Sequence, residues 1–123
     1  MARAKIVALV GEAAVRQALA PDADDTTMAL AVRYTLQVLA ENAPGNTVEV
    51  RVPPFGAVQC IEGPVHTRGT PPNVIETDPS TWVQLATGAV SWGDAVASGR
   101  ISASGQRANL TGQLPVSWQR TPV

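Results

Sequence analysis

The feature that most constrains the fold is the segment 78–88, which has residues typical of a helix start at one end and of a helix stop at the other. Asp78 is a preferred N-cap residue, and Pro79 suits the first turn because proline has no N–H to leave unpaired there. Gly88 stands where a left-handed residue commonly ends such a helix. The sequence therefore predicts a short helix between these markers.

A second helix and a strand are predicted immediately afterwards. Ser91, with Asp94 three residues later, resembles the start of a capping box, and Gly99 marks the end of the helix. Residues 100–104 then alternate, with Ile101 and an alanine on one face and serines on the other. This alternation predicts a short strand.

Two longer helices are predicted before residue 45. Apolar residues recur at helical spacing over residues 4–20. The alternative there is a strand over residues 5–10 followed by Gly11 and a helix, as in a nucleotide-binding unit. Residues 26–42 form the second predicted helix, with a threonine at 26 or 27 as its cap and a Pro-Gly pair as its stop.

Three further strands are predicted in the middle of the chain, over residues 47–52, 57–62 and 74–76. In the first of them valines alternate with polar residues, which is typical of a sheet with one covered face. At 123 residues the chain is long enough for one core. We therefore predict one α+β domain over 1–123, with a small, mainly antiparallel sheet covered on one face by helices and a loose tail after residue 115.

Composition excludes several classes of function. A net charge of −1 without a basic stripe predicts no nucleic-acid partner. No apolar stretch has the length of a membrane span. The single cysteine, Cys60, gives no reason to expect an oxidising compartment, so a cytoplasmic location is predicted. With one histidine and one cysteine, neither a metal site nor a cofactor is predicted.

Several short motifs together resemble a known family. An acidic residue leads into a Trp-containing helix that ends in Thr-Gly, a second helix leads to a Gly-Arg-Ile strand, and Leu114-Pro115 follows. This order resembles the C-terminal half of sterol carrier protein domains. With the segment from His66 to Asn73, and a likeness from about residue 26 onward, the chain is similar to a compact bacterial branch of that family. The resemblance implies a sterol carrier protein-like fold with an apolar tunnel between sheet and helices.

A tunnel of this kind would be lined by apolar residues of the inner sheet face and of the packed helices. The alternative is that the same side chains simply fill one another as a core. The candidates for the lining are Leu30, Tyr34, Val48, Val50, Val52, Trp82, Val83 and Ile101.

A polar loop is the second candidate site. It carries an imidazole, a guanidinium, hydroxyls and an amide within eight residues, and the guanidinium suits a carboxylate or phosphate. The alternative is a structural loop whose polar groups bond to backbone and to nearby carboxylates. The candidates are His66, Thr67, Arg68 and Asn73, with Arg51 and Gln59 from the neighbouring strands.

Three functions remain open from the sequence. The first is a non-catalytic carrier that binds a fatty acyl chain or another lipid, with no catalytic residue assigned. The second is an accessory module with a filled core, which presents the loop at residues 66–73 to a protein partner or to a second copy as a homodimer. The third is an enzyme that uses His66 with Glu76 or Asp78.

Overall fold

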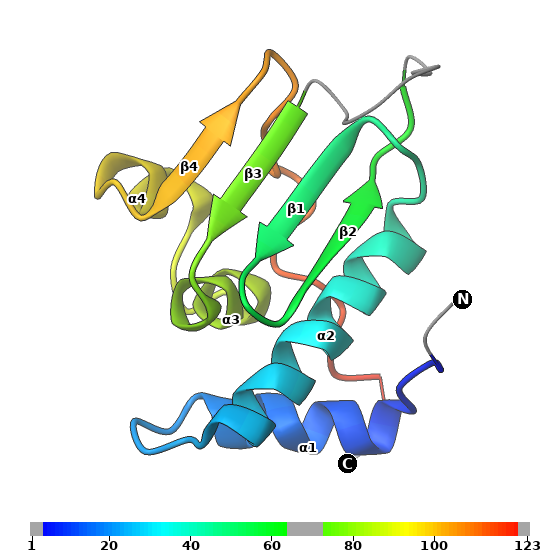
Figure 1. The fold of residues 1–123 in the computed structure, drawn as a ribbon, viewed down its shortest axis with the longest axis vertical. Coiled ribbons are helices and arrows are strands. Elements are labelled where there is room, and N and C mark those ends of the chain that lie inside the picture. Colours follow the sequence, from blue (N-terminus) through cyan, green and yellow to red (C-terminus); the bar gives the residue numbers. More distant parts are fainter. Residues whose placement is uncertain (1–3, 64–72, 121–123) are drawn as a thin grey trace.

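The computed structural model describes residues 4–63 and 73–120 and has the α+β fold that the sequence predicts (Figure 1). Helices pack with a four-stranded sheet in which two of the three strand pairings are antiparallel. In chain order the elements are α1 (Ala8–Ala18), α2 (Asp25–Asn42), β1 (Val48–Val52), β2 (Gly56–Cys60), β3 (Asn73–Thr77), α3 (Pro79–Thr87), α4 (Trp92–Ala97) and β4 (Ile101–Ser104).

The strands lie in the order β2-β1-β3-β4. β1 is antiparallel to β2 and parallel to β3, and β3 is antiparallel to β4. Val50 lies opposite both Val58 and Ile75 in this register, so the three side chains share the face that the helices cover. Glu49 and Arg51 alternate with the buried valines of β1 and belong to the other, more polar face. The predicted one-sided burial of β1 is confirmed.

α1 begins later than predicted, at Ala8, and no strand forms over residues 5–10. The reason is that the Gln37 side chain of α2 forms hydrogen bonds with both the N–H and the carbonyl of Ile6. The Ile6 N–H donates to Gln37 Oε1 at 2.9 Å, and Gln37 Nε2 donates to the Ile6 carbonyl at 2.9 Å. These two bonds hold residues 4–7 against α2 and outside the helix. A helical pattern in the sequence does not reveal this competition.

α2 is capped by Asp24, and the prediction of a threonine cap is wrong. Asp24 has the extended backbone of an N-cap residue, and its side chain accepts the Thr27 N–H at 2.8 Å. The two threonines lie inside the first turn. The hydrogen bond to the Thr27 N–H lowers the pKa of the Asp24 carboxyl.

The predicted ends of α3 and α4 are confirmed. The Asp78 side chain accepts the Thr81 N–H, and Gly88 closes α3 in the left-handed region at φ 84°. The Ser91 hydroxyl accepts the Asp94 N–H at 3.1 Å. Local sequence therefore fixed these boundaries.

β2 ends two residues earlier than predicted because the chain turns at Ile61. Ile61 has a φ of 69°, a left-handed conformation that is unusual for a β-branched residue. Its N–H donates to the Ala43 carbonyl at 2.7 Å, and its carbonyl accepts the Thr47 N–H at 3.1 Å. These bonds tie the end of β2 to the residues between α2 and β1.

The C-terminal segment is not loose, as far as residue 120. The Val116 N–H donates to the Ala86 carbonyl at 2.9 Å, and the Tyr34 hydroxyl donates to the Trp118 carbonyl at 3.3 Å. The Arg120 N–H donates to the buried carboxylate of Glu12 at 3.0 Å. The segment runs from the sheet to α1, so residues near the C-terminus contact the first helix (Figure 1).

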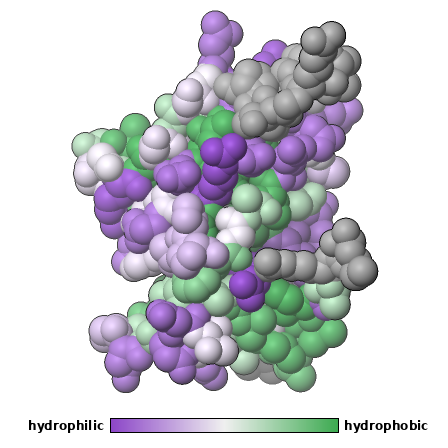
Figure 2. Space-filling view, in the orientation of Figure 1, coloured by the Kyte–Doolittle hydropathy of each residue, from purple (hydrophilic) through white to green (hydrophobic). Residues whose placement is uncertain are grey.

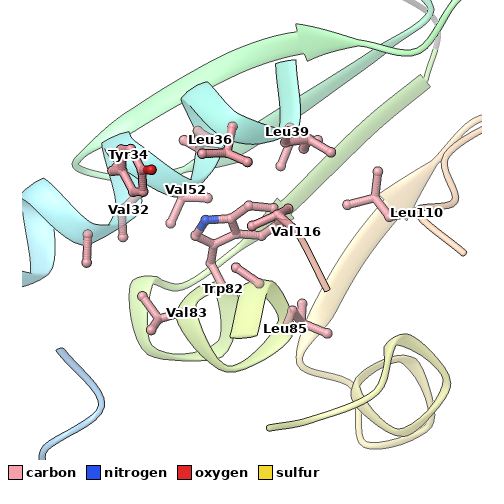
Figure 3. Close-up of a cluster of buried hydrophobic side chains, with 14 of the residues drawn as sticks. Val32, Tyr34, Leu36, Leu39, Val52, Trp82, Val83, Leu85, Leu110 and Val116 are labelled. Carbon is pink, nitrogen blue, oxygen red and sulfur yellow. The ribbon is translucent and has the colours of Figure 1, made fainter. Parts of the chain in front are cut away.

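The core lies between the sheet and helices α2 and α3, with Trp82 at its centre (Figure 3). The Trp82 indole N–H donates to Thr35 Oγ1 at 2.8 Å, so its polar atom is paired inside the core. The Thr35 hydroxyl in turn donates to the Ala31 carbonyl at 2.7 Å. Cys60 is also buried, and burial raises the pKa of its thiol to about 11, which leaves it unreactive.

Candidate functional site

An open groove of about 740 Å³ lies between α2, β2 and the residues that precede α1. Its size is in the range of small-molecule pockets. Most of its lining is aliphatic, with one guanidinium and one amide. The lining residues are Ala4, Ile6, Leu30, Arg33, Leu36, Gln37, Gly56, Ala57 and Val58. We call this the α2–β2 groove.

Three structural features shape the walls of the α2–β2 groove. Gln37 holds the backbone of Ile6, which places the Ile6 side chain on one wall. Gly56 begins β2 on the opposite wall, and a Cβ built on it would lie 3.5 Å from a Leu36 methyl group. Val58 faces α2 but is only half-buried, because the groove exposes it. The bonds from Gln37 to Ile6 and the lack of a side chain at Gly56 therefore shape two walls of the groove.

Arg33 supplies the positive charge of the groove. It is exposed on α2, and its Nε donates to the Phe55 carbonyl at 2.9 Å. That bond anchors the guanidinium next to the start of β2. Among the described residues its two terminal nitrogens have no hydrogen-bond partner. They are therefore available to an anionic group.

Most of the predicted apolar lining residues lie in the interior and not along this groove. Tyr34, Val48, Val50, Val52, Trp82 and Val83 each have at most 1% of their surface exposed. Figure 3 shows Tyr34, Val52, Trp82 and Val83 packed among other core side chains. Ile101 is half-buried at the sheet edge, and Leu30 lines the α2–β2 groove. The structure thus brings six of the eight together as mutually packed neighbours.

The predicted polar site is dispersed where the structure describes it. His66, Thr67 and Arg68 lie outside the described residues. Arg51 forms an ion pair with Glu49 on the outer sheet face.

The other two polar candidates bond within the protein. Gln59 accepts a hydrogen bond from Asn46 at 2.6 Å on the outer face. Asn73 is buried, donates to the Thr47 carbonyl at 2.9 Å and accepts the Arg107 N–H at 2.9 Å. Asn73 therefore fixes the start of β3. A ligand-binding role for these side chains stays a prediction.

The two carboxylates that the enzyme hypothesis pairs with His66, those of Glu76 and Asp78, have different surroundings. Glu76 is exposed on β3, and Asp78 caps α3. Burial raises the pKa of the Asp78 carboxyl, but hydrogen bonds from the Thr81 side chain and backbone outweigh it, and the pKa lies below its ordinary value. Within the described ranges, no three His, Cys, Asp or Glu side chains cluster in a way that would hold a metal ion.

Sequence reasoning missed Ile6, Arg33, Gln37 and Val58 as groove residues. One signal was present in the sequence: helical spacing places residues 30, 33 and 37 on one face of α2. That face carries an apolar side chain, a cation and an amide next to the apolar residues of the helix. The contribution of residues 4–7 had no local signal, because it depends on the contact between Ile6 and Gln37.

Comparison with known proteins identifies the family. Residues 24–116 match the family described as bacterial SCP orthologs, and the chain belongs to this bacterial sterol carrier protein-like family. The comparison with curated proteins gives no significant match. α1 and the segment after residue 116 lie outside the matched range. None of the described helices combines the length and the apolar character needed to cross a membrane.

Proposed function

We propose that this protein is a non-catalytic carrier that binds an amphipathic ligand with one long apolar chain and an anionic head, such as a fatty acid. The observation that carries the proposal is the α2–β2 groove, which combines an aliphatic lining with one anchored guanidinium. Membership of the sterol carrier protein-like family supports the same class of ligand.

The apolar chain would lie against Ile6, Leu30 and Val58. These side chains are half-buried, so covering them removes apolar surface from water at about 25 cal/mol per Å² before ordering costs are subtracted. The fully buried interior contributes no such surface. The ligand therefore binds beside the core and not within it.

The head group would bind the terminal nitrogens of Arg33. The bond from Arg33 Nε to the Phe55 carbonyl restrains the guanidinium before binding, which lowers the entropy lost on contact with a carboxylate. The loop at residues 66–73 stays a second candidate for the head group.

The test uses oleate and oleyl alcohol, which share a chain and differ in charge. We expect calorimetry to find one oleate per chain. Leu30→Gln weakens the binding of both ligands about 10-fold because it places an amide among the lining side chains. Arg33→Ala weakens oleate about 10-fold and leaves oleyl alcohol unchanged. Arg100→Ala removes another exposed arginine, which bonds Ser98 and Gln84, and is the matched control.

Two results would contradict the proposal. The first is a protein that purifies without a lipid by native mass spectrometry and takes up neither ligand. The second is an Arg33→Ala variant that loses no more oleate affinity than Arg100→Ala, which would remove Arg33 from the site.

One observation favours a second candidate, an interaction module with a filled core. Six of the eight predicted lining residues are sealed in the interior, as in a domain that has no internal ligand. Failure of both lipids to bind would favour this function.

A further inference from the structure

Exposed apolar side chains concentrate on α1 and the residues beside it. Among the described residues, the large exposed apolar side chains are Val7, Leu9, Val10, Leu19 and Val96. The first four lie within residues 7–19, and Leu9 is 65% exposed. Figure 2 shows hydrophobic surface gathered at the lower right, at the end of the molecule that α1 occupies in Figure 1. Apolar surface of this kind marks an interaction site more often than scattered single residues do.

A second groove lies next to these side chains, between α1 and the start of α2. Its volume is about 390 Å³, and a small residue, Ala13, stands midway along it. The lining residues are Leu9, Val10, Ala13, Ala14, Gln17, Thr26, Thr27 and Leu30. We call this the α1–α2 groove. Leu9 and Val10 line this groove and are also exposed to solvent. A second copy could therefore insert its own Leu9 and Val10 into the groove.

The charges around the α1–α2 groove are arranged with opposite signs at its two ends. Lys5 precedes α1, and its side chain is 72% exposed although it pairs with Glu41 at 2.7 Å. Asp22 and Asp25 follow α1 and are exposed. If two copies of α1 pack antiparallel about Ala13, the start of each helix, which Lys5 precedes, lies beside the end of the other helix, which Asp22 follows. The arrangement is complementary to itself.

The same charges disfavour an anionic lipid surface as the occupant. Asp22, Asp24 and Asp25 border the apolar patch, and Lys5 and Arg16 are the basic residues within the described range 4–25. A membrane with negative head groups would be repelled by this acidic border.

We propose that the α1 face is the interface of a symmetric homodimer. Two α1 helices pack antiparallel about Ala13, with Leu9 and Val10 of each copy in the α1–α2 groove of the other. Lys5 of each copy faces Asp22 and Asp25 of the other. α1 lies outside the range that matches the family. The proposal does not depend on a lipid ligand.

The oligomeric state tests the proposal directly. We expect light scattering with size exclusion to give twice the chain mass of 12.8 kDa at micromolar concentration. Leu9→Glu raises the dimer dissociation constant about 100-fold or more, because it buries two new carboxylates in the interface. Val96→Glu, at an exposed valine of α4, is the matched control and keeps the dimer. A wild-type monomer, or a dimer that Leu9→Glu leaves intact, overturns the proposal.

The antiparallel arrangement has its own test. Lys5→Glu weakens the dimer about 10-fold, and combining it with Asp22→Lys and Asp25→Lys restores the affinity. If the triple variant is as weak as Lys5→Glu alone, the arrangement is wrong. Thermal unfolding of each variant shows that the fold is kept.

A cysteine at the proposed two-fold axis provides a third readout. The native Cys60 is buried, so Ala13→Cys introduces an accessible thiol. We expect mild oxidation to give a disulfide-linked dimer of Ala13→Cys. Ala103→Cys, at an exposed residue of β4, forms no disulfide-linked dimer under the same conditions. Equal cross-linking of both variants contradicts the proposal. So does a monomer that sediments with phosphatidylglycerol vesicles in a Leu9-dependent way.

Discussion

α2 borders two regions that differ in how completely they are filled. On the side of the sheet and α3, Trp82 has no exposed surface, and Thr35 of α2 accepts its indole N–H. On the side of β2 and residues 4–7, the same helix presents Leu30 and Arg33 to an open groove of about 740 Å³. The comparison teaches that burial in this protein is decided by what covers each face of the helix and not by its periodicity.

Small side chains explain why the region between α2, the sheet and α3 is completely filled. Alanine and valine are common in the core, and they let the helices approach the sheet closely. The large rings of Trp82 and Tyr34 occupy the remaining space. On the groove side no described element covers Leu30 and Val58 completely, although both face inward from neighbouring elements. The apolar surface there is only half-buried.

Truncation of one residue from each region gives the largest contrast. We expect Trp82→Ala to lower the free energy of unfolding by about 3–5 kcal/mol, since it leaves a cavity and removes the hydrogen bond that Thr35 Oγ1 accepts from the indole. Leu30→Ala, on the half-buried groove wall, costs about 1 kcal/mol. Urea unfolding measures both. Similar losses for the two variants would erase the distinction between the regions.

A pair of glycines tests the same distinction for close contacts. A Cβ on Gly11 of α1 would lie 2.2 Å from the Tyr34 ring, so Gly11→Ala forces α1 and α2 apart and costs about 2–3 kcal/mol. A Cβ on Gly56 meets Leu36 at 3.5 Å, an ordinary contact, and Gly56→Ala changes stability by less than about 1 kcal/mol. Thermal unfolding compares the two. A stable Gly11→Ala protein would show that the α1 contact is loose.

The cap of α3 provides a pH-dependent prediction of intermediate size. Asp78→Ala lowers the free energy of unfolding by about 1 kcal/mol at pH 7. Because the pKa of Asp78 is lowered in the folded state, its charge stabilises the fold above the unfolded pKa of ~4 and loses this effect as the pH falls through the lower folded value.

A matched variant separates this charge from the hydrogen bond. Asp78→Asn still accepts the Thr81 N–H and has no carboxylate to titrate. The difference in unfolding free energy between wild type and Asp78→Asn should therefore shrink as the pH drops below ~4. A constant difference between pH 7 and pH 3 would mean that the charge adds nothing to the cap.

The last predicted effect on stability has the opposite sign. Thr47 is buried before β1, and among the described residues its hydroxyl has no hydrogen-bond partner. Thr47→Val keeps the shape and removes the unpaired group, so we expect a gain of about 1 kcal/mol in the free energy of unfolding. A loss on chemical denaturation would show that the hydroxyl is paired in solution.

The boundaries of the short elements could be predicted because their causes are local. Asp78, Gly88 and Ser91 each act on backbone groups within a few residues, and each prediction is confirmed. The start of α1 could not be predicted, since it depends on hydrogen bonds between Ile6 and Gln37, 31 residues apart. The C-terminal segment was predicted as loose for the same reason: its partners Ala86 and Glu12 are distant in the sequence.

The sequence by itself determined the α+β class, the one-sided burial of β1 and the resemblance to sterol carrier proteins, because alternation, caps and motifs are properties of neighbouring residues. Only the tertiary structure decided that Tyr34 fills the core while Leu30, four residues earlier on the same helix and also a predicted lining residue, lines a groove. Periodicity states which way a side chain points. Whether another element covers it depends on contacts between segments far apart in the chain, and that difference separates a core from a binding surface.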